Sequence, residues 1–139
     1  MQHPNILELS RSALLIIDVQ EAFRASIKDF DKLGARIAIA ARGAQLLNLP
    51  IIVTEQYPKG LGHTAAEITA VLPGGTNVLE KTSFSSCGAQ QFFSKLQERE
   101  TKHEAERIGQ FEFLKVFVNR SRRVEIKLQR GATSIRIFG

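Results

Sequence analysis

The chain has 139 residues, of which 43% are hydrophobic and 24% charged, the proportions of a single globular domain. Its single cysteine excludes a disulfide scaffold. No apolar run approaches the roughly 18 residues that a membrane span requires. The first residues lack the basic and apolar regions of a secretory signal, so we expect a cytoplasmic protein with no membrane partner.

The formal net charge of +5 comes from one end of the chain. Residues 1–98 hold 9 Lys+Arg and 9 Asp+Glu, whereas residues 99–139 hold 10 and 5. We therefore expect a core over residues 1–98 and a basic, atypical C-terminal segment of the same domain over residues 99–139. The arginines of 120–123 have no interleaved aromatics and no nucleic-acid motif, so we expect no nucleic-acid partner.

Short apolar runs alternate with helical patterns in the first part of the chain. Residues 13–17 are apolar at both parities, which is typical of a strand covered on both faces. Residues 50–54 and 77–81 predict two further strands. Between the first two strands, spacings of three and four predict one helix face formed by Phe30, Leu33, Ile37, Ala40, Ala44 and Leu47.

Two shorter helices are expected after the second strand. Residues 56–62 form a loop by their Pro and Gly content. Thr64 and Glu67 match a capping box, followed by Ile68, Val71 and Leu72. Ser85 or Ser86 is expected to cap a further helix that carries Phe92, Phe93 and Leu96 inward. This β-α-β-α-β-α order predicts an α/β fold with a parallel sheet and right-handed crossovers.

The last part of the chain follows a period of two. Val124, Ile126 and Leu128 alternate with charged or polar residues, and Ile135 and Ile137 flank Arg136. This alternation predicts half-exposed strands, usually antiparallel.

Polar residues follow the predicted parallel strands where each one ends. Asp18 follows the first strand, Glu55 to Tyr57 follow the second, and Lys81 ends the third. Ligands bind beyond the carboxyl ends of such strands. A carboxylate and an ammonium that meet there hold each other charged and are able to move a proton or activate a nucleophile. From spacing alone, the alternatives are a simple salt bridge or two residues that never meet.

Three segments carry a resemblance to a known family. Residues 13–23, ALLIIDVQEAF, resemble the first motif of the isochorismatase-like hydrolase superfamily, the cysteine hydrolases. Residues 53–62, VTEQYPKGLG, are similar to the second-strand motif of its metal-free branch, and residues 80–85, EKTSFS, to the motif of the family lysine. The resemblance covers residues 10–97.

The resemblance implies a three-layer α/β/α, Rossmann-like fold that assembles into homo-oligomers, with a C-terminal part truncated or divergent here. It also implies a catalytic Asp, Lys and Cys. Asp18 would be the general acid or base and Lys81 its charge partner. In hydrolytic members the cysteine attacks a carbonyl or nitrile-like carbon, and backbone amides hold the oxyanion. Members that act on vinyl ethers transfer a proton from the aspartate without needing the cysteine.

The family nucleophile is not found where the resemblance places it. It normally follows a fourth apolar strand, and the corresponding residues 113–120 contain no cysteine. Cys87 follows Lys81 by six residues at the start of a predicted helix, where the thiol pKa falls. It is therefore a candidate nucleophile, with a small buried or semi-exposed structural residue as the favoured interpretation. A frameshifted or rearranged tail is one explanation for residues 99–139, and a divergent native tail is the other.

The predicted site needs no metal or organic cofactor. The metal-binding branch uses an Asp and two His after the second strand, and residues 55–58, EQYP, lack the paired histidines. His63 is interpreted as a loop or pocket residue. The candidate substrate pocket comprises Gln20, Phe23, Glu55, Tyr57 and His63, although Phe23 and Tyr57 equally suit a packed core.

The leading hypothesis is an isochorismatase-family hydrolase that acts on a small amide, imide or vinyl ether. The alternative is a catalytically incomplete or frameshifted member, a folded oligomeric scaffold without hydrolase activity.

Overall fold

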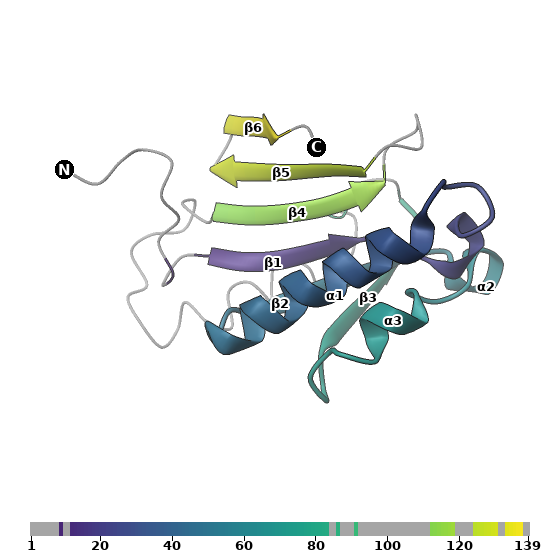
Figure 1. Cartoon of the computed structure of the whole chain (residues 1–139), viewed down its shortest axis with the longest axis horizontal. Coiled ribbons are helices and arrows are strands. Elements are labelled where there is room, and N and C mark those ends of the chain that lie inside the picture. Colours follow the sequence, from purple (N-terminus) through teal and green to yellow (C-terminus); the bar gives the residue numbers. More distant parts are fainter. Residues whose placement is uncertain are drawn as a thin grey trace.

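The computed structural model describes residues 9, 12–83, 86 and 91, together with the backbone of residues 112–118, 124–130 and 133–137. A six-stranded sheet in the order β3-β2-β1-β4-β5-β6 organises this part of the chain (Figure 1). Its strands are β1 (Ser12–Ile17), β2 (Ile51–Gln56), β3 (Asn77–Lys81), β4 (Glu112–Val118), β5 (Val124–Arg130) and β6 (Thr133–Ile137).

The first four strands are parallel, and the last two are antiparallel. β1 pairs in parallel with β2 and with β4, and β2 pairs in parallel with β3. β5 pairs antiparallel with β4 and β6. The α/β fold with a mainly parallel sheet is confirmed, and so are the antiparallel strands that the alternation in the tail predicted. The second strand extends two residues beyond the predicted 50–54.

One face of the sheet is covered by α1 (Phe30–Leu46) and the short α3 (Ala66–Thr69) (Figure 1). Between them and the sheet lies the larger core cluster, which includes Leu14, Ile16, Val53, Ile37 and Ile68. The opposite face is also buried, since Leu15, Ile52 and Leu79 form a second cluster. Strands β1 and β2 are therefore buried on both faces, as continuous apolar strands require. The predicted helix with Phe92, Phe93 and Leu96 lies outside the described residues.

The inward face of α1 differs in part from its prediction. Leu47 is 54% exposed, beyond the end of the helix, and Leu33 and Ala40 are only half-buried. The buried positions are Phe30, Gly34, Ile37, Ala41 and Ala44. Gly34 is buried because α3 passes so close that a Cβ at this position would overlap the Glu67 side chain. Small residues therefore define this face as much as large apolar ones do.

The predicted capping box before α3 is wrong. The N-cap is Ala65, and no side chain of its own segment caps the helix. Instead the Ala66 N–H donates to Glu21 Oε1 at 2.9 Å, and the Thr64 hydroxyl donates to Glu55. A carboxylate from another element thus satisfies a free amide of the first turn. The predicted 56–62 loop contains the four-residue helix α2 (Pro58–Leu61).

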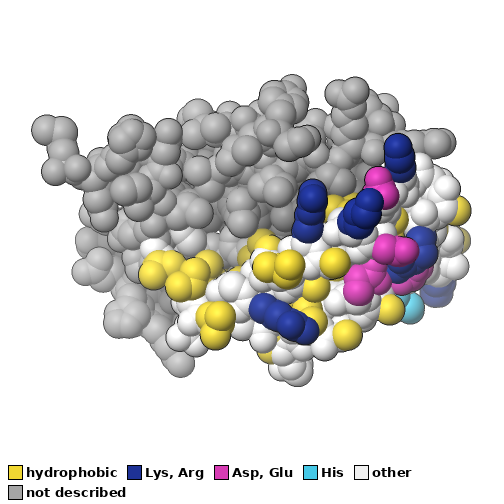
Figure 2. All heavy atoms as spheres, viewed as in Figure 1, with side chains coloured by type: hydrophobic (Ala, Val, Ile, Leu, Met, Phe, Trp, Pro, Cys, Tyr) yellow, Lys and Arg dark blue, Asp and Glu magenta, His cyan; other side chains and the backbone are white. Residues whose placement is uncertain are grey.

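The acidic side chains on the α1–α3 side of the molecule gather towards one end (Figure 2). Asp and Glu gather with Lys and Arg towards the end where the single-turn helix η2 (Glu21–Phe23) and α2 lie (Figures 1 and 2). Exposed apolar residues lie towards the other end of α1, among them Leu46 and Leu47. The carboxyl ends of the parallel strands β1 to β4 lie at the charged end (Figure 1).

Candidate active site at the carboxyl edge of the sheet

The parallel register brings three strand ends together. Ile17 of β1 lies opposite Thr54 of β2, and Gln56 of β2 lies opposite Lys81 of β3. Because the strands run the same way, residues that follow them collect at one edge of the sheet. The backbone of Asp18, after β1, and that of Lys81, in β3, therefore lie on the two sides of β2 at the same edge of the sheet.

Asp18 and Lys81 form an ion pair at this edge. Nζ of Lys81 lies 2.6 Å from Oδ2 of Asp18, so the pairing expected from the sequence is present. The Lys81 side chain is 0% exposed and that of Asp18 is 16% exposed. The hydroxyl of the buried Thr54 donates to Oδ1 of Asp18 at 2.8 Å, and Nζ of Lys81 also donates to the Ser83 carbonyl at 3.2 Å. Both carboxylate oxygens are thus held by donors.

The backbone at Asp18 adopts a left-handed conformation, with φ of 53°. Its N–H still donates to the Thr54 carbonyl at 3.0 Å, so the chain leaves the sheet directly after this bond. Asp tolerates this region better than most residues, but such a conformation still costs about 1–3 kcal/mol and concentrates at functional sites. The turn sets the carboxylate beside β2 and β3 instead of continuing the strand.

This geometry suits proton transfer. A carboxylate that retains some exposure is able to exchange a proton with a bound molecule, whereas the ammonium is enclosed. The ammonium 2.6 Å away places a positive charge directly beside the carboxylate oxygen. The Thr54 hydroxyl fixes the orientation of the carboxyl group. Thr54 was not expected from the sequence, since a threonine in a strand is ordinary.

A second polar cluster is centred on Glu55, the residue after Thr54 on β2, whose side chain lies on the opposite face of the sheet. Glu55, whose side chain is 5% exposed, accepts bonds from the N–H and the hydroxyl of Thr64, both at 2.7 Å. Nδ1 of His63 lies 3.0 Å from its other oxygen, Oε2. Burial by itself would raise the pKa of Glu55, but the bonds from Thr64 and His63 outweigh it and lower the pKa. The hydrogen bond to Glu55 in turn raises the pKa of His63.

The remaining predicted pocket residues have different surroundings. Phe23 is half-buried and packs against the larger core cluster. Tyr57 is 57% exposed at the start of α2, with a left-handed φ of 42°. The carboxamide of Gln20 is buried and bonded to the backbone of Gln56 and Gly62. His63 and Tyr57 are therefore the accessible members of the set.

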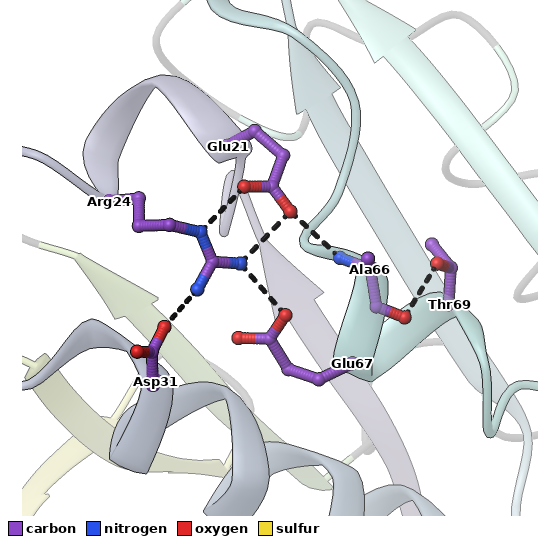
Figure 3. Close-up of polar contacts among 6 residues, drawn as sticks. All are labelled: Glu21, Arg24, Asp31, Ala66, Glu67 and Thr69. Atoms are coloured by element: carbon purple, nitrogen blue, oxygen red, sulfur yellow. Dashed lines mark hydrogen bonds and ion pairs between the residues drawn. The ribbon is translucent and has the colours of Figure 1, made fainter.

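An arginine network fastens the segment that follows Asp18 (Figure 3). Arg24 contacts three carboxylates: Glu21 at 2.8 Å, Glu67 at 2.8 Å, and Asp31. Its guanidinium also lies over the Phe30 ring, 4.8 Å from the centroid. The hydrogen bond from Arg24, with help from the Ala66 amide, lowers the pKa of Glu21 to about 2. The spacing of Glu21 and Arg24 was visible in the sequence, but the partners on α1 and α3 were not.

The candidate nucleophile Cys87 lies outside the described residues, as does the connection after β4. β4 itself is parallel to β1, with Phe117 opposite Ile17, so its carboxyl end lies at the same edge as Asp18. Among the described residues, no three His, Cys, Asp or Glu side chains are grouped closely enough to hold a metal ion. In the same part of the chain no helix is long and apolar enough to cross a membrane.

Comparison with known proteins identifies the family. The family model of the isochorismatase domain matches residues 12–104, which include both members of the ion pair and all three motifs. The chain belongs to the isochorismatase family. This family is hydrolase-like, and residues 105–139 lie beyond the matched region.

The curated relatives are longer than the matched part of this chain. Isochorismatase domain-containing protein 2 of Danio rerio is 43% identical over 79 residues, 57% of this chain and 39% of that protein. Isochorismatase domain-containing protein 1 of Salmo salar is 48% identical over 71 residues, 49% of this chain and 23% of that protein. The match thus spans about two fifths or less of the length of these relatives.

Solved structures share the α/β fold. The MAR1 ribonuclease of Caenorhabditis elegans is 38% identical, with a TM-score of 0.59 over 63% of this chain and 46% of that one. An isochorismatase of Pseudomonas putida is 24% identical, with a TM-score of 0.56 over 70% and 55% of the two chains. The second of these supports the fold alone.

Proposed function

We propose that this isochorismatase-family protein is a hydrolase of small amides, imides or vinyl ethers that uses Asp18 and Lys81 without a metal or an organic cofactor. The observation that carries the proposal is the enclosed ion pair at 2.6 Å, with Thr54 on the second carboxylate oxygen. Family membership favours this function over the alternative of a folded scaffold without hydrolase activity.

In the vinyl-ether reaction, Asp18 donates a proton to the terminal carbon of the double bond. The carbon attached to oxygen becomes an oxocarbenium centre, water adds to it, and the adduct separates into a carbonyl compound and an alcohol. Lys81 stabilises the carboxylate left after the proton has moved, and the proton released from water restores the carboxyl group. This sequence requires no cysteine.

Hydrolysis of an amide or imide requires a nucleophile as well. A thiolate would attack the carbonyl carbon, and Asp18 would pass the thiol proton to the leaving nitrogen before water releases the acyl group. Cys87 is the single thiol of the chain. Because residues 113–120 contain no cysteine, we expect thiol-dependent turnover to be weak or absent and the proton-transfer branch to prevail.

Substrate contacts are proposed for the accessible side chains near this edge. Tyr57 offers an exposed ring, and His63 offers an imidazole that Glu55 orients. Gln20 and Phe23 support the site through packing and hydrogen bonds. We also propose that residues 1–98 form the catalytic core and that the protein assembles into homo-oligomers, which light scattering of the purified protein tests.

The experiment is a panel of small amides, imides and vinyl ethers assayed with the parent, Asp18→Asn and Asp29→Asn. Asp29 is a matched control, because it also has a left-handed φ, of 58°, and also pairs with a lysine, but at the exposed surface. Asp18→Asn should abolish turnover while Asp29→Asn retains it. Equal turnover by the parent and Asp18→Asn would refute the proposal. Alkylation with iodoacetamide and the variant Cys87→Ala measure the thiol-dependent share.

RNA cleavage is a second candidate, favoured by the 38% identity to the nematode protein called a ribonuclease. A carboxylate base and an ammonium are also suited to activating a ribose hydroxyl against phosphate. A single-stranded RNA in the same panel decides between the candidates. RNA cleavage that Asp18→Asn removes, without turnover of any small substrate, would replace the leading proposal.

A further inference from the structure

The left-handed turn at Asp18 interrupts the hydrogen-bond ladder between β1 and β2. In a regular parallel ladder, a residue whose N–H bonds one strand neighbour offers its carbonyl to the residue two positions further along that neighbour. The Asp18 N–H donates to Thr54, so its carbonyl would be expected to accept the Gln56 N–H. With φ of 53° at Asp18, the chain turns away before this bond is made.

The side chain of Gln20 takes the missing place in the ladder. Its Oε1 accepts the Gln56 N–H at 2.8 Å, and its Nε2 donates to the Gln56 carbonyl at 3.0 Å. Nε2 also donates to the Gly62 carbonyl at 2.6 Å. Gln20 is 0% exposed, so these bonds form away from water and are costly to lose. The carboxamide behaves as one further residue of β1.

Gln56, whose N–H and carbonyl both bond to Gln20, is also the residue opposite Lys81. Gln56 lies opposite Lys81 in the β2–β3 register, and the next N–H, of Tyr57, donates to the Lys81 carbonyl at 2.9 Å. Gln20 therefore connects the turn that carries the carboxylate to the strand end that borders the ammonium. The positions of Asp18 and Lys81 therefore both depend on backbone that the Gln20 side chain holds in place.

We propose that Gln20 is a positioning residue that keeps Asp18 in its left-handed conformation, facing Lys81. Gln20 does not contact the substrate, because its carboxamide is buried and engaged with Gln56 and Gly62. The inference rests on the proposed function of the ion pair. It assigns to Gln20 a role that differs from lining the pocket.

The test variant is Gln20→Glu, which has nearly the same shape. When ionised, the introduced carboxylate faces two carbonyl oxygens and cannot donate to either; when protonated, it regains one donor. The matched control is Gln45→Glu, since Nε2 of Gln45 also donates to a backbone carbonyl, that of Val71 at 2.7 Å, on the α1–α3 side. Both variants lose a similar bond, and only one of them adjoins the ion pair.

With whichever substrate of the panel is turned over, kcat of Gln20→Glu should fall by about tenfold or more with KM nearly unchanged, because positioning acts on the reacting geometry. Activity should rise again as the pH is lowered and the introduced carboxyl takes up its proton. Gln45→Glu should keep the kcat and the pH profile of the parent. A parental kcat and pH profile in folded Gln20→Glu would overturn the proposal.

A readout that needs no substrate separates this inference from the proposed function. Nitrogen-15 NMR of the lysine ammonium groups should show a signal for Lys81 that is protected from water, assigned by its loss in Lys81→Met. Gln20→Glu should shift or broaden that signal at high pH, and Gln45→Glu should leave it in place. An unchanged signal in folded Gln20→Glu refutes positioning, whereas a shifted signal without turnover by the parent refutes only the proposed reaction.

Should Gln20→Glu fail to fold, Gln20→Met gives the same comparison. Methionine fills a similar volume and introduces no charge, but it makes none of the three bonds. Its Lys81 signal and kcat should change in the same direction, and parental values for both would overturn the proposal.

Discussion

Replacement of Lys81 by methionine removes the ammonium from Oδ2 of Asp18 and keeps the Thr54 hydroxyl on Oδ1. Removal of one member of a buried ion pair costs about 3–5 kcal/mol, because the partner remains charged away from water. Asp18 keeps 16% of its side-chain surface exposed, so we expect the lower end of this range, about 3 kcal/mol. Asp18→Asn should cost about the same, since it leaves an enclosed ammonium.

The double variant Asp18→Asn/Lys81→Met should be far less destabilised than the sum of the two single variants. Because the double variant removes both members of the ion pair, the coupling energy should reach about 2–3 kcal/mol. Urea unfolding followed by far-UV circular dichroism measures all four proteins under the same conditions. A coupling energy below roughly 0.5 kcal/mol would refute the ion pair as a buried unit.

The exposed pair of Asp29 and Lys32 serves as the matched control cycle. Its atoms lie 3.0 Å apart, but the lysine and aspartate side chains are 75% and 51% exposed. Exposed pairs typically contribute about 0.2–1 kcal/mol. The coupling measured with Asp29→Asn and Lys32→Met should therefore fall well below that of the buried pair.

Three further outcomes are expected. Thr54→Val should lower the free energy of unfolding by about 2 kcal/mol, because the Asp18 carboxylate loses a hydrogen bond. The control Thr69→Val, at an exposed hydroxyl, should change the free energy of unfolding by less than about 0.5 kcal/mol. Urea unfolding compares the two variants with the parent. The raised pKa of His63 stabilises the fold below its ordinary value of 6.5, and this contribution is lost as pH rises through the raised pKa. The stability difference between the parent and His63→Gln should thus shrink towards alkaline pH, and a constant difference in thermal melts would contradict the pair. Gly43→Ala, with open space around its Cβ, should stabilise α1 by about 0.5–1 kcal/mol, while Gly34→Ala should destabilise the protein; the opposite order of melting temperatures would refute the α1–α3 packing.

Much of the fold was predictable because its signals are local. An apolar run at both parities predicted β1, short apolar segments predicted β2 and β3, and the period of two predicted β5 and β6. The inward face of α1 was predictable only in part. Gly34 is buried because α3 approaches closely, and hydrophobicity alone does not report such an approach.

The position of the candidate site was predictable, but the hydrogen-bond partners within and around it were not. Asp18 and Lys81 were expected because parallel strands bring their carboxyl ends to one edge. A capping box of Thr64 and Glu67 was predicted, but the carboxylate that caps this helix, at the Ala66 amide, is Glu21, from a different segment. A capping box describes one stretch of chain, whereas this bond joins two stretches that meet only after folding.

The sequence by itself determined β1 to β3, β5, β6 and the helix α1, and which charged residues end or follow the parallel strands, since these follow from patterns within a few residues. The tertiary structure decided which polar groups meet. The register of β2 set Thr54 against Asp18, and the left-handed turn at Asp18 left a ladder bond that the side chain of Gln20 completes. Hydrogen bonds act over about 3 Å, so such partners depend on the exact register and turn that packing selects.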